Sequence, residues 1–139
     1  MNLDQLICFY NEFAPDSVAR FPEFYSADAY FKDPFNEVRG LVEIEAVFAH
    51  MFRTLDLPHF VVCDRIAHGQ QAFLTWDFRF RFKGEDRWQS IHGATRLQFD
   101  AQGLVISHRD YWDAAEELYE KLPVLGALMR WLKRRVMRA

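Results

Sequence analysis

The sequence predicts an α+β fold in which helices lie on one face of a curved antiparallel sheet. Three observations support it: apolar residues recur at helical spacing up to residue 55, they alternate at strand spacing over 59–112, and short polar turns separate the alternating segments. Helices followed by consecutive strands are typical of α+β domains. A chain of 139 residues is long enough for one apolar core. We therefore expect one domain over residues 1–115, with an additional helix in 116–139.

The first part of the chain contains three helical patterns. Residues 3–13 carry apolar side chains at helical spacing after a cap at Asn2 or Asp4. Residues 16–25 predict a second helix. Residues 41–55 give the strongest amphipathic pattern, and we expect that helix to pack across the sheet.

Strand patterns fill the second part of the chain. A short extended segment is expected at 29–32, and four longer strands are expected near 59–67, 71–83, 87–99 and 104–112. Strand alternation sends Trp76 and Phe78 toward the helices. It also places His108, Asp110 and Trp112 on one side of the last strand. That side becomes polar near its end, which predicts the mouth of a pocket there.

The sequence does not decide on which face of the sheet His92 lies. Alternation along 87–99 puts Thr95 on one face with Ile91, and it puts His92 on the other. A bulge at Gly93 would reverse this order, because a bulge inserts one residue into the pairing. The sequence therefore allows His92 on either face.

Asp33 is a candidate acid-base group. It precedes Pro34, which restricts it to extended or turn geometry and thus to the end of an element. A carboxylate in an apolar cavity has its charged form disfavoured, which suits it to shuttle a proton between carbons of a ligand. The alternative is that Asp33 caps the following turn by accepting hydrogen bonds from backbone N–H groups.

Charge divides the chain into two parts. Residues 1–122 hold twelve Lys and Arg against twenty Asp and Glu, a net charge of −8, whereas residues 123–139 hold five basic residues and no acid. An acidic body argues against nucleic acid as the main partner. Residues 123–139 form a basic amphipathic helix pattern with Trp131, which can lie on an anionic membrane surface. Closure of the cavity, or packing on a dimer partner, is the more common use of such a helix, and we expect it ahead of membrane contact.

The cysteines, the N-terminal residues and the histidines predict the compartment of the protein and whether it binds a metal. Cys8 and Cys63 are too few for a disulfide framework and predict buried thiols in a reducing compartment, by default the cytoplasm. Asp4 and Glu12 stand where a signal peptide would be apolar, so no export is expected. The five His residues lack metal-ligand spacing, and we predict no metal.

Residues 2–115 resemble the nuclear transport factor 2-like superfamily, particularly its SnoaL-like and ketosteroid-isomerase-like branch. The resemblance rests on the run from Tyr25 to Phe35 with Asp33-Pro34 near its end, on the following Arg39-Gly40 and helix, and on Tyr111-Trp112. It implies a cone-shaped sheet wrapped around the N-terminal helices. It also implies a cavity for a small apolar molecule, no cofactor, and a homodimer through the outer face of the sheet.

The same resemblance implies roles for individual residues. Asp33 matches the general base of the isomerases, Tyr10 matches the donor to the oxyanion, and Tyr25 matches the tyrosine that supports this donor. His108 or Asp110 is expected to supply a second donor, and these two complete the predicted catalytic set with Asp33 and Tyr10.

The chain also departs from the isomerase pattern. Thr95 falls at or near the protonated acid of the isomerase oxyanion hole, and Phe48 falls near its third tyrosine. The predicted ligand-binding residues are Tyr25, Phe48, Trp76, Phe78, Thr95 and Trp112. Together these residues indicate a pocket for an apolar carbonyl-type ligand, with acid-base chemistry at Asp33. The alternatives are a cofactor-free isomerase, cyclase or lyase, and a non-catalytic dimerisation module with a membrane-surface helix.

Overall fold

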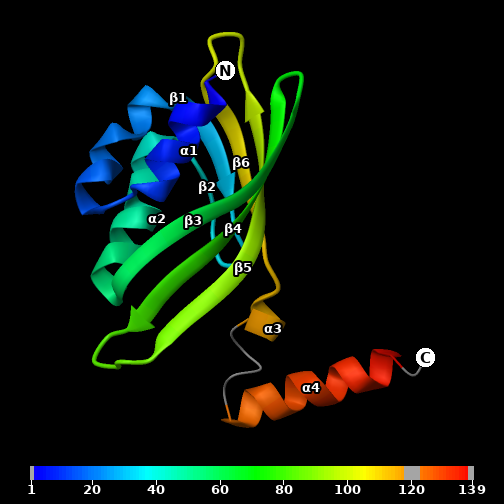
Figure 1. Ribbon diagram of the computed structural model, residues 1–139. Helices are drawn as coiled ribbons and strands as arrows, with labels where there is room; N and C mark the ends of the chain where they lie inside the picture. The colour runs from blue at the N-terminus through cyan, green and yellow to red at the C-terminus, as the bar shows by residue number, and fades with distance from the viewer. Residues whose placement is uncertain (1, 118–122, 138–139) are drawn as a thin grey trace.

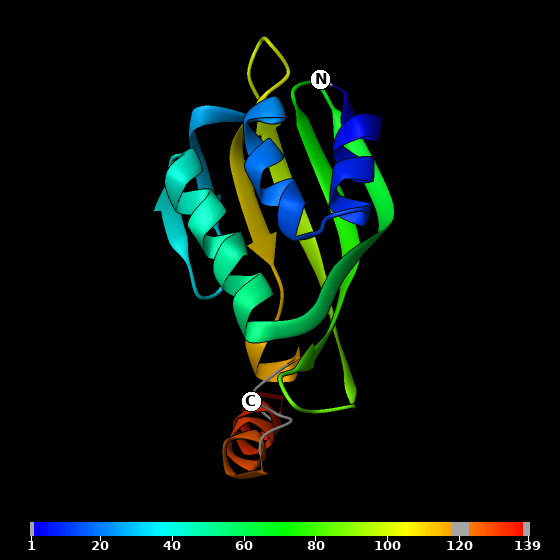
Figure 2. The ribbon, with the colours of Figure 1, turned by 90° about the vertical axis from the view of Figure 1, so that its left-hand side faces the viewer.

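A curved six-stranded sheet, covered on one face by helices, forms the body of the protein (Figures 1 and 2). The computed structural model describes residues 2–117 and 123–137. The strand order is β2-β1-β6-β5-β4-β3. The elements are α1 (Leu3–Asn11), the 3-10 helix η1 (Pro15–Glu23), β1 (Tyr25–Lys32), β2 (Glu37–Arg39), α2 (Leu41–Thr54), β3 (Leu55–His68), β4 (Gln71–Phe82), β5 (Trp88–Phe99), β6 (Val105–Tyr111), α3 (Ala114–Glu117) and α4 (Pro123–Met137). The predicted α+β class is confirmed.

The N-terminal helices follow their sequence signals with one correction. The side chain of Asn2 caps α1 by accepting a hydrogen bond from the Gln5 N–H group at 3.1 Å. The second helix is the 3-10 helix η1 and ends at Glu23, because Pro22 within it cannot donate a backbone hydrogen bond. The prediction that this helix runs to Tyr25 was wrong. Tyr25 instead opens β1, which places its side chain on the sheet.

One junction of the sheet is parallel. β1 pairs with β6 in parallel, with Tyr25 opposite Val105 and Phe31 opposite His108. The other neighbouring strands are antiparallel, and one of them, the three-residue β2, was not predicted. The parallel junction brings the beginning of the sheet beside its last strand.

The pairing of β4 with β5 fixes the face of His92. The register is unbroken between these strands, and it sets Trp76 opposite Gly93 and Asp77 opposite His92. His92 therefore lies on the outer face, away from the helices. Gly93 leaves room for the indole, since a Cβ atom at this position would lie 2.5 Å from the ring of Trp76.

Aromatic side chains fill the space between the helices and the sheet. Phe21 is at the centre of this core, with its ring centroid 5.5 Å from that of Phe9, 5.0 Å from that of Tyr25 and 5.2 Å from that of Phe48. Phe21 is only 1% exposed. Such edge-on and tilted ring pairs add stabilisation beyond the area that they bury.

The helix α4 lies apart from the sheet (Figure 1). It begins at Pro123, and Leu122, where the sequence pattern starts, lies outside the described residues. Leu128, Leu132 and Val136 on α4 are all exposed. None of the described helices is both long enough and apolar enough to cross a membrane.

Candidate acid-base site

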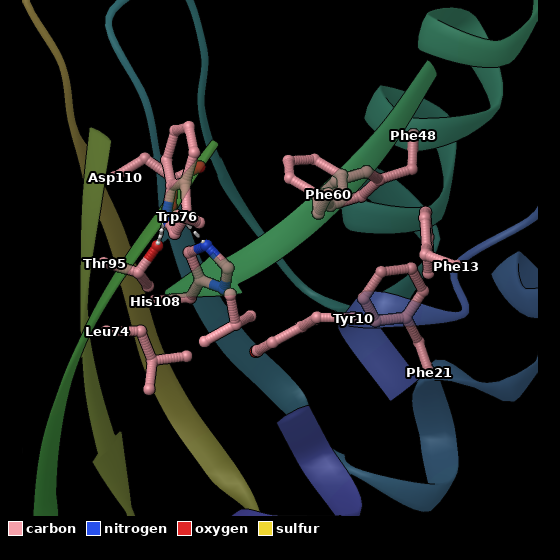
Figure 3. A pocket seen from close by; sticks show the side chains of 11 residues that line it. Tyr10, Phe13, Phe21, Phe48, Phe60, Leu74, Trp76, Thr95, His108 and Asp110 are labelled. Carbon is pink, nitrogen blue, oxygen red and sulfur yellow. Dashed lines mark hydrogen bonds and ion pairs between the residues drawn. The ribbon is translucent and has the colours of Figure 1, made fainter. Parts of the chain in front are cut away.

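A small cavity of about 30 Å³ lies between the helices and the inner face of the sheet. This volume has room for about two water molecules. Figure 3 shows aromatic rings on one side of it, with the sheet residues Trp76, Thr95, His108 and Asp110 grouped on the other. The lining residues are Tyr10, Phe13, Phe21, Phe48, Phe60, Val62, Leu74, Trp76, Thr95, His108 and Asp110.

Four elements bring the polar side chains of the site together. His108 and Asp110 alternate with exposed residues on β6 and therefore share its inner face. The pairing of β5 with β6 sets Thr95 directly opposite Asp110. Tyr25 comes from the first residue of β1, and Tyr10 from the last turn of α1.

Hydrogen bonds join these side chains into one continuous series. The hydroxyl oxygens of Tyr10 and Tyr25 are 2.6 Å apart, and the Tyr25 oxygen is 2.6 Å from Nδ1 of His108. Nε2 of His108 lies 2.7 Å from Oδ1 of Asp110. The same Oδ1 accepts a hydrogen bond from the hydroxyl of Thr95 at 2.6 Å.

Trp76 forms one end of this series, where its Nε1–H group donates a hydrogen bond to Oγ1 of Thr95 at 2.7 Å. The six side chains together are named the polar relay: Tyr10, Tyr25, His108, Asp110, Thr95 and Trp76. Buried polar groups that all find partners hold one another in a single arrangement.

The donors of the relay define one consistent direction. An indole N–H group can only donate, so the hydroxyl of Thr95 accepts a hydrogen bond from Trp76 and donates one to Asp110. With Asp110 as a carboxylate, His108 donates from Nε2 and accepts at Nδ1 from Tyr25. The hydroxyl of Tyr25 then accepts from Tyr10. A proton that enters at Tyr10 therefore has a continuous path to His108.

Burial keeps both tyrosines of the relay neutral. Burial is the largest cause that raises the pKa of the Tyr10 hydroxyl far above its ordinary value, and the charge of Asp110 raises it further, against a smaller opposing effect of the Tyr25 hydrogen bond. Burial, followed by the interaction with Tyr10, likewise raises the pKa of Tyr25. Neither phenol forms a stable phenolate near neutral pH.

The raised pKa values of Tyr10 and Tyr25 predict a loss of stability in alkali. Both groups hold their protons more tightly in the folded chain than in the unfolded chain. Their contribution to stability is therefore complete below about pH 10, the ordinary tyrosine pKa, and is lost as the pH rises above it. We expect Tyr25→Phe to flatten the fall of the unfolding free energy above pH 10 by about 1.4 kcal/mol per pH unit. Urea unfolding at a series of pH values measures this slope, and an unchanged slope would contradict the assignment.

Asp33 lies outside the cavity. Its Oδ1 accepts hydrogen bonds from the backbone N–H groups of Phe35 at 2.8 Å and Asn36 at 2.6 Å, and the Asn36 side chain donates to both carboxylate oxygens. It lines a separate surface hollow with Trp112. Asp110 lines both the cavity and this hollow. The carboxylate of Asp33 therefore holds a turn.

This geometry predicts unequal effects for two substitutions of Asp33. Asp33→Ala removes the acceptor of two backbone N–H groups and is expected to lower the unfolding free energy by about 1–2 kcal/mol. Asp33→Asn keeps an oxygen at the Oδ1 position, so we expect less than half of that loss. Urea unfolding of both variants tests the prediction, and equal losses would show that charge rather than the capping oxygen matters.

The remaining predicted ligand-binding residues fall in different places. Phe48 lines the cavity. Phe78 stacks on Phe60, with 4.6 Å between the ring centroids. Phe60 lines the cavity, and Phe78 does not. Trp112 packs edge-on against Phe35 at 5.5 Å. The structure therefore joins Tyr10, Tyr25, His108, Asp110, Thr95 and Trp76, and it separates Asp33 and Trp112 from them.

Other lining residues were not singled out from the sequence. Phe13 and Phe21 come from the N-terminal segment, and Phe60 and Val62 come from β3. The alternation of Phe60 and Val62 along β3 is the signal that could have placed both on the inner face. Within residues 2–117 and 123–137, no three His, Cys, Asp or Glu side chains gather in a group that could hold a metal ion.

Solved structures share this fold at low sequence identity. A protein from Catenulispora acidiphila with a ketosteroid isomerase-like fold, in complex with trimethylamine, is 16% identical, with a TM-score of 0.67 over 78% of this chain and 82% of that chain. TsrD from Streptomyces laurentii is 20% identical, with a TM-score of 0.67 over 90% and 92%. An LEH-like epoxide hydrolase from M. tuberculosis is 14% identical, with a TM-score of 0.65 over 94% and 91%. These likenesses confirm the nuclear transport factor 2-like fold.

The family follows from the sequence comparison. No curated protein matches the chain by sequence. The profile of the SnoaL-like domain, however, matches residues 8–108, from α1 to the His108 of the relay. The predicted resemblance is confirmed, and the chain belongs to the SnoaL-like domain family.

Proposed function

We propose that the cavity binds a small apolar carbonyl compound and that the polar relay removes and returns a proton on it. The observation that carries this proposal is the unbroken series of hydrogen bonds from Tyr10, at the cavity wall, to Asp110. Apolar walls with a few convergent polar groups are typical of small-molecule sites. The relay, rather than Asp33, is the base in this proposal, because the Asp33 carboxylate is engaged by backbone N–H groups.

Proton transfer through the relay needs no phenolate. As the C–H bond beside the carbonyl breaks, its proton passes to the oxygen of Tyr10, the Tyr10 proton passes to Tyr25, and the Tyr25 proton passes to Nδ1 of His108. The electron pair of the C–H bond enters the enolate of the ligand. His108 becomes an imidazolium beside the Asp110 carboxylate, which stabilises the positive charge. Return of the proton to another carbon completes an isomerisation.

The raised pKa values of the tyrosines favour this concerted path. A separate tyrosinate would be costly because burial disfavours it in both residues. Concerted movement leaves Tyr10 and Tyr25 neutral at the start and at the end. Charge appears only on the enolate and on His108, whose partner is the carboxylate of Asp110.

The small volume of the cavity limits the ligand. At about 30 Å³ the cavity admits a ligand larger than water only if aromatic side chains of its wall move. Phe60 of that wall is only partly buried and is not part of the relay, which makes it a candidate for this movement. We therefore propose small ketones and aldehydes as the ligand class.

Hydration of an epoxide is a second candidate reaction. The cavity has room for about two water molecules beside the relay, and the same base could deprotonate one of them for attack on an epoxide carbon. An LEH-like epoxide hydrolase shares this fold, although at 14% identity. Loss of an epoxide probe without exchange of a ketone probe would favour this reaction.

Deuterium exchange tests the main proposal. The protein is incubated in deuterium oxide with acetone, cyclohexanone or acetophenone, and NMR follows loss of the proton signal beside the carbonyl. We expect exchange faster than in buffer alone, with saturation as the ketone concentration rises. Binding without exchange of any probe would leave a pocket protein and overturn the proposed chemistry. The homodimer through the outer face of the sheet stays a prediction.

A further inference from the structure

The helix α4 presents an exposed apolar row. Leu128, Leu132 and Val136 are four residues apart and so lie on one side of the helix. They are 48%, 43% and 76% exposed. A continuous apolar row on the surface marks a site of interaction when a partner of suitable chemistry is available.

Cations and Trp131 surround this row. At helical spacing, Arg135 and then Trp131 follow Leu128 on one side of the row and Lys133 borders the other side, whereas Arg130 and Arg134 fall on the opposite side. The guanidinium of Arg135 lies over the ring of Trp131, 5.3 Å from its centroid. Long basic side chains can lay their apolar stems along a buried surface while their charged ends stay in the polar layer. The helix therefore matches a partner with an apolar interior and a layer of anionic groups at its surface.

The outer face of the sheet does not match this helix. Lys32, Arg109 and Arg96 lie opposite one another on neighbouring strands of that face, but Lys32 forms an ion pair with Glu37, and Asp77 lies on the same face. A second copy of the chain would therefore offer the five basic residues of 123–139 cations as well as carboxylates on this face, and not a continuous anionic surface. An anionic bilayer instead offers an apolar interior and phosphate groups together.

We propose that α4 lies flat on the surface of an anionic lipid bilayer, with Leu128, Leu132 and Val136 in its apolar layer and the basic residues at the phosphate groups. Trp131 occupies the interface, where a ring with one polar edge is favoured. The helix does not span the membrane in this arrangement. It holds the SnoaL-like body at the surface.

Vesicle flotation with the full chain tests the inference. We expect binding to vesicles of phosphatidylcholine mixed with phosphatidylserine, and much weaker binding to phosphatidylcholine alone. The emission of Trp131 is expected to shift to shorter wavelength on binding, and a Trp131→Phe variant identifies its share of the signal. Lys133→Gln, at the border of the apolar row, is expected to weaken binding about fivefold, whereas Arg87→Gln, in the exposed loop between β4 and β5, leaves it unchanged.

Two valine variants provide the matched comparison. Val136 on α4 and Val42 on α2 are almost equally exposed, at 76% and 78%. We expect Val136→Glu to weaken vesicle binding about tenfold or more, because it removes apolar contact and adds a negative charge. Val42→Glu makes the same change on a different helix and is expected to have no effect.

Four outcomes would overturn the inference. They are absence of binding to the phosphatidylserine vesicles, equal binding to both vesicle types, equal loss in the Val136→Glu and Val42→Glu variants, and a lipid-free dimer that Val136→Glu dissociates. The last outcome would assign the apolar row to a second copy of the chain. Ketone exchange is measured separately, so the result does not depend on the proposed chemistry.

Discussion

Replacement of His108 by Gln is expected to lower the rate of ketone exchange by about 10²–10⁴-fold, the usual contribution of a general base. His108 is the only member of the relay that can take the proton from Tyr25 and hold it beside Asp110. Glutamine keeps a polar side chain but cannot accept a proton at neutral pH. NMR exchange rates of the two proteins at equal ketone concentration provide the measurement.

The chain offers a matched control for this substitution. His92 on the outer face also bonds an aspartate, with Nδ1 2.8 Å from Oδ1 of Asp77. His92→Gln therefore removes an equivalent histidine–aspartate pair that has no contact with the cavity, and we expect it to leave the exchange rate unchanged. Equal losses in His92→Gln and His108→Gln would contradict the relay. Circular dichroism of both variants separates loss of chemistry from loss of fold.

Replacement of Phe21 by Ala is expected to lower the unfolding free energy by about 3–5 kcal/mol, since it removes a buried ring from the centre of the aromatic core. Phe21 is 1% exposed and packs on Phe9, Phe13, Tyr25 and Phe48. It also lines the cavity, so the substitution joins the vacated space to the space that is already there. Urea unfolding measures the loss of stability.

The enlarged cavity of Phe21→Ala gives a second readout. Apolar cavities of this kind bind small aromatic molecules. Toluene is therefore expected to raise the melting temperature of Phe21→Ala and to have little effect on the unchanged protein. Phe73→Ala, on the outer face and 46% exposed, is the control and is expected to cost less than about 1 kcal/mol. Equal losses in both variants would contradict the central position of Phe21.

Local periodicity was sufficient to predict most of the elements. The helix α2 and the strands β4 to β6 each carry a long apolar pattern, and their bounds fall close to those predicted, whereas β3 begins at Leu55, which was predicted to belong to the helix. The end of η1 was misplaced because helical spacing continues through Phe24, although Pro22 does not support a longer helix. β2 has only three residues, too few for a pattern, and it depends on pairing with β1.

The site was only partly visible in the sequence. Tyr10, Tyr25, His108 and Asp110 could be named from spacing and resemblance, but the hydrogen bond between Tyr25 and His108 joins residues that are 83 positions apart in the chain. Such contacts depend on strand order, which no local pattern contains. For Asp33 the deciding signal was local: Asn36, three residues later, supplies N–H groups from both its backbone and its side chain.

The parallel junction between β1 and β6 has a consequence for the order of folding. Its two strands are separated by most of the sheet in the sequence, so closing this junction carries a large loss of chain entropy. Contacts between distant segments slow folding. The bond between Tyr25 and His108 crosses this junction, and so an intermediate that contains only the β3–β5 hairpins has no relay. The proton path is therefore expected to appear together with the last cooperative step of folding, and its appearance would report that the chain has reached the native state.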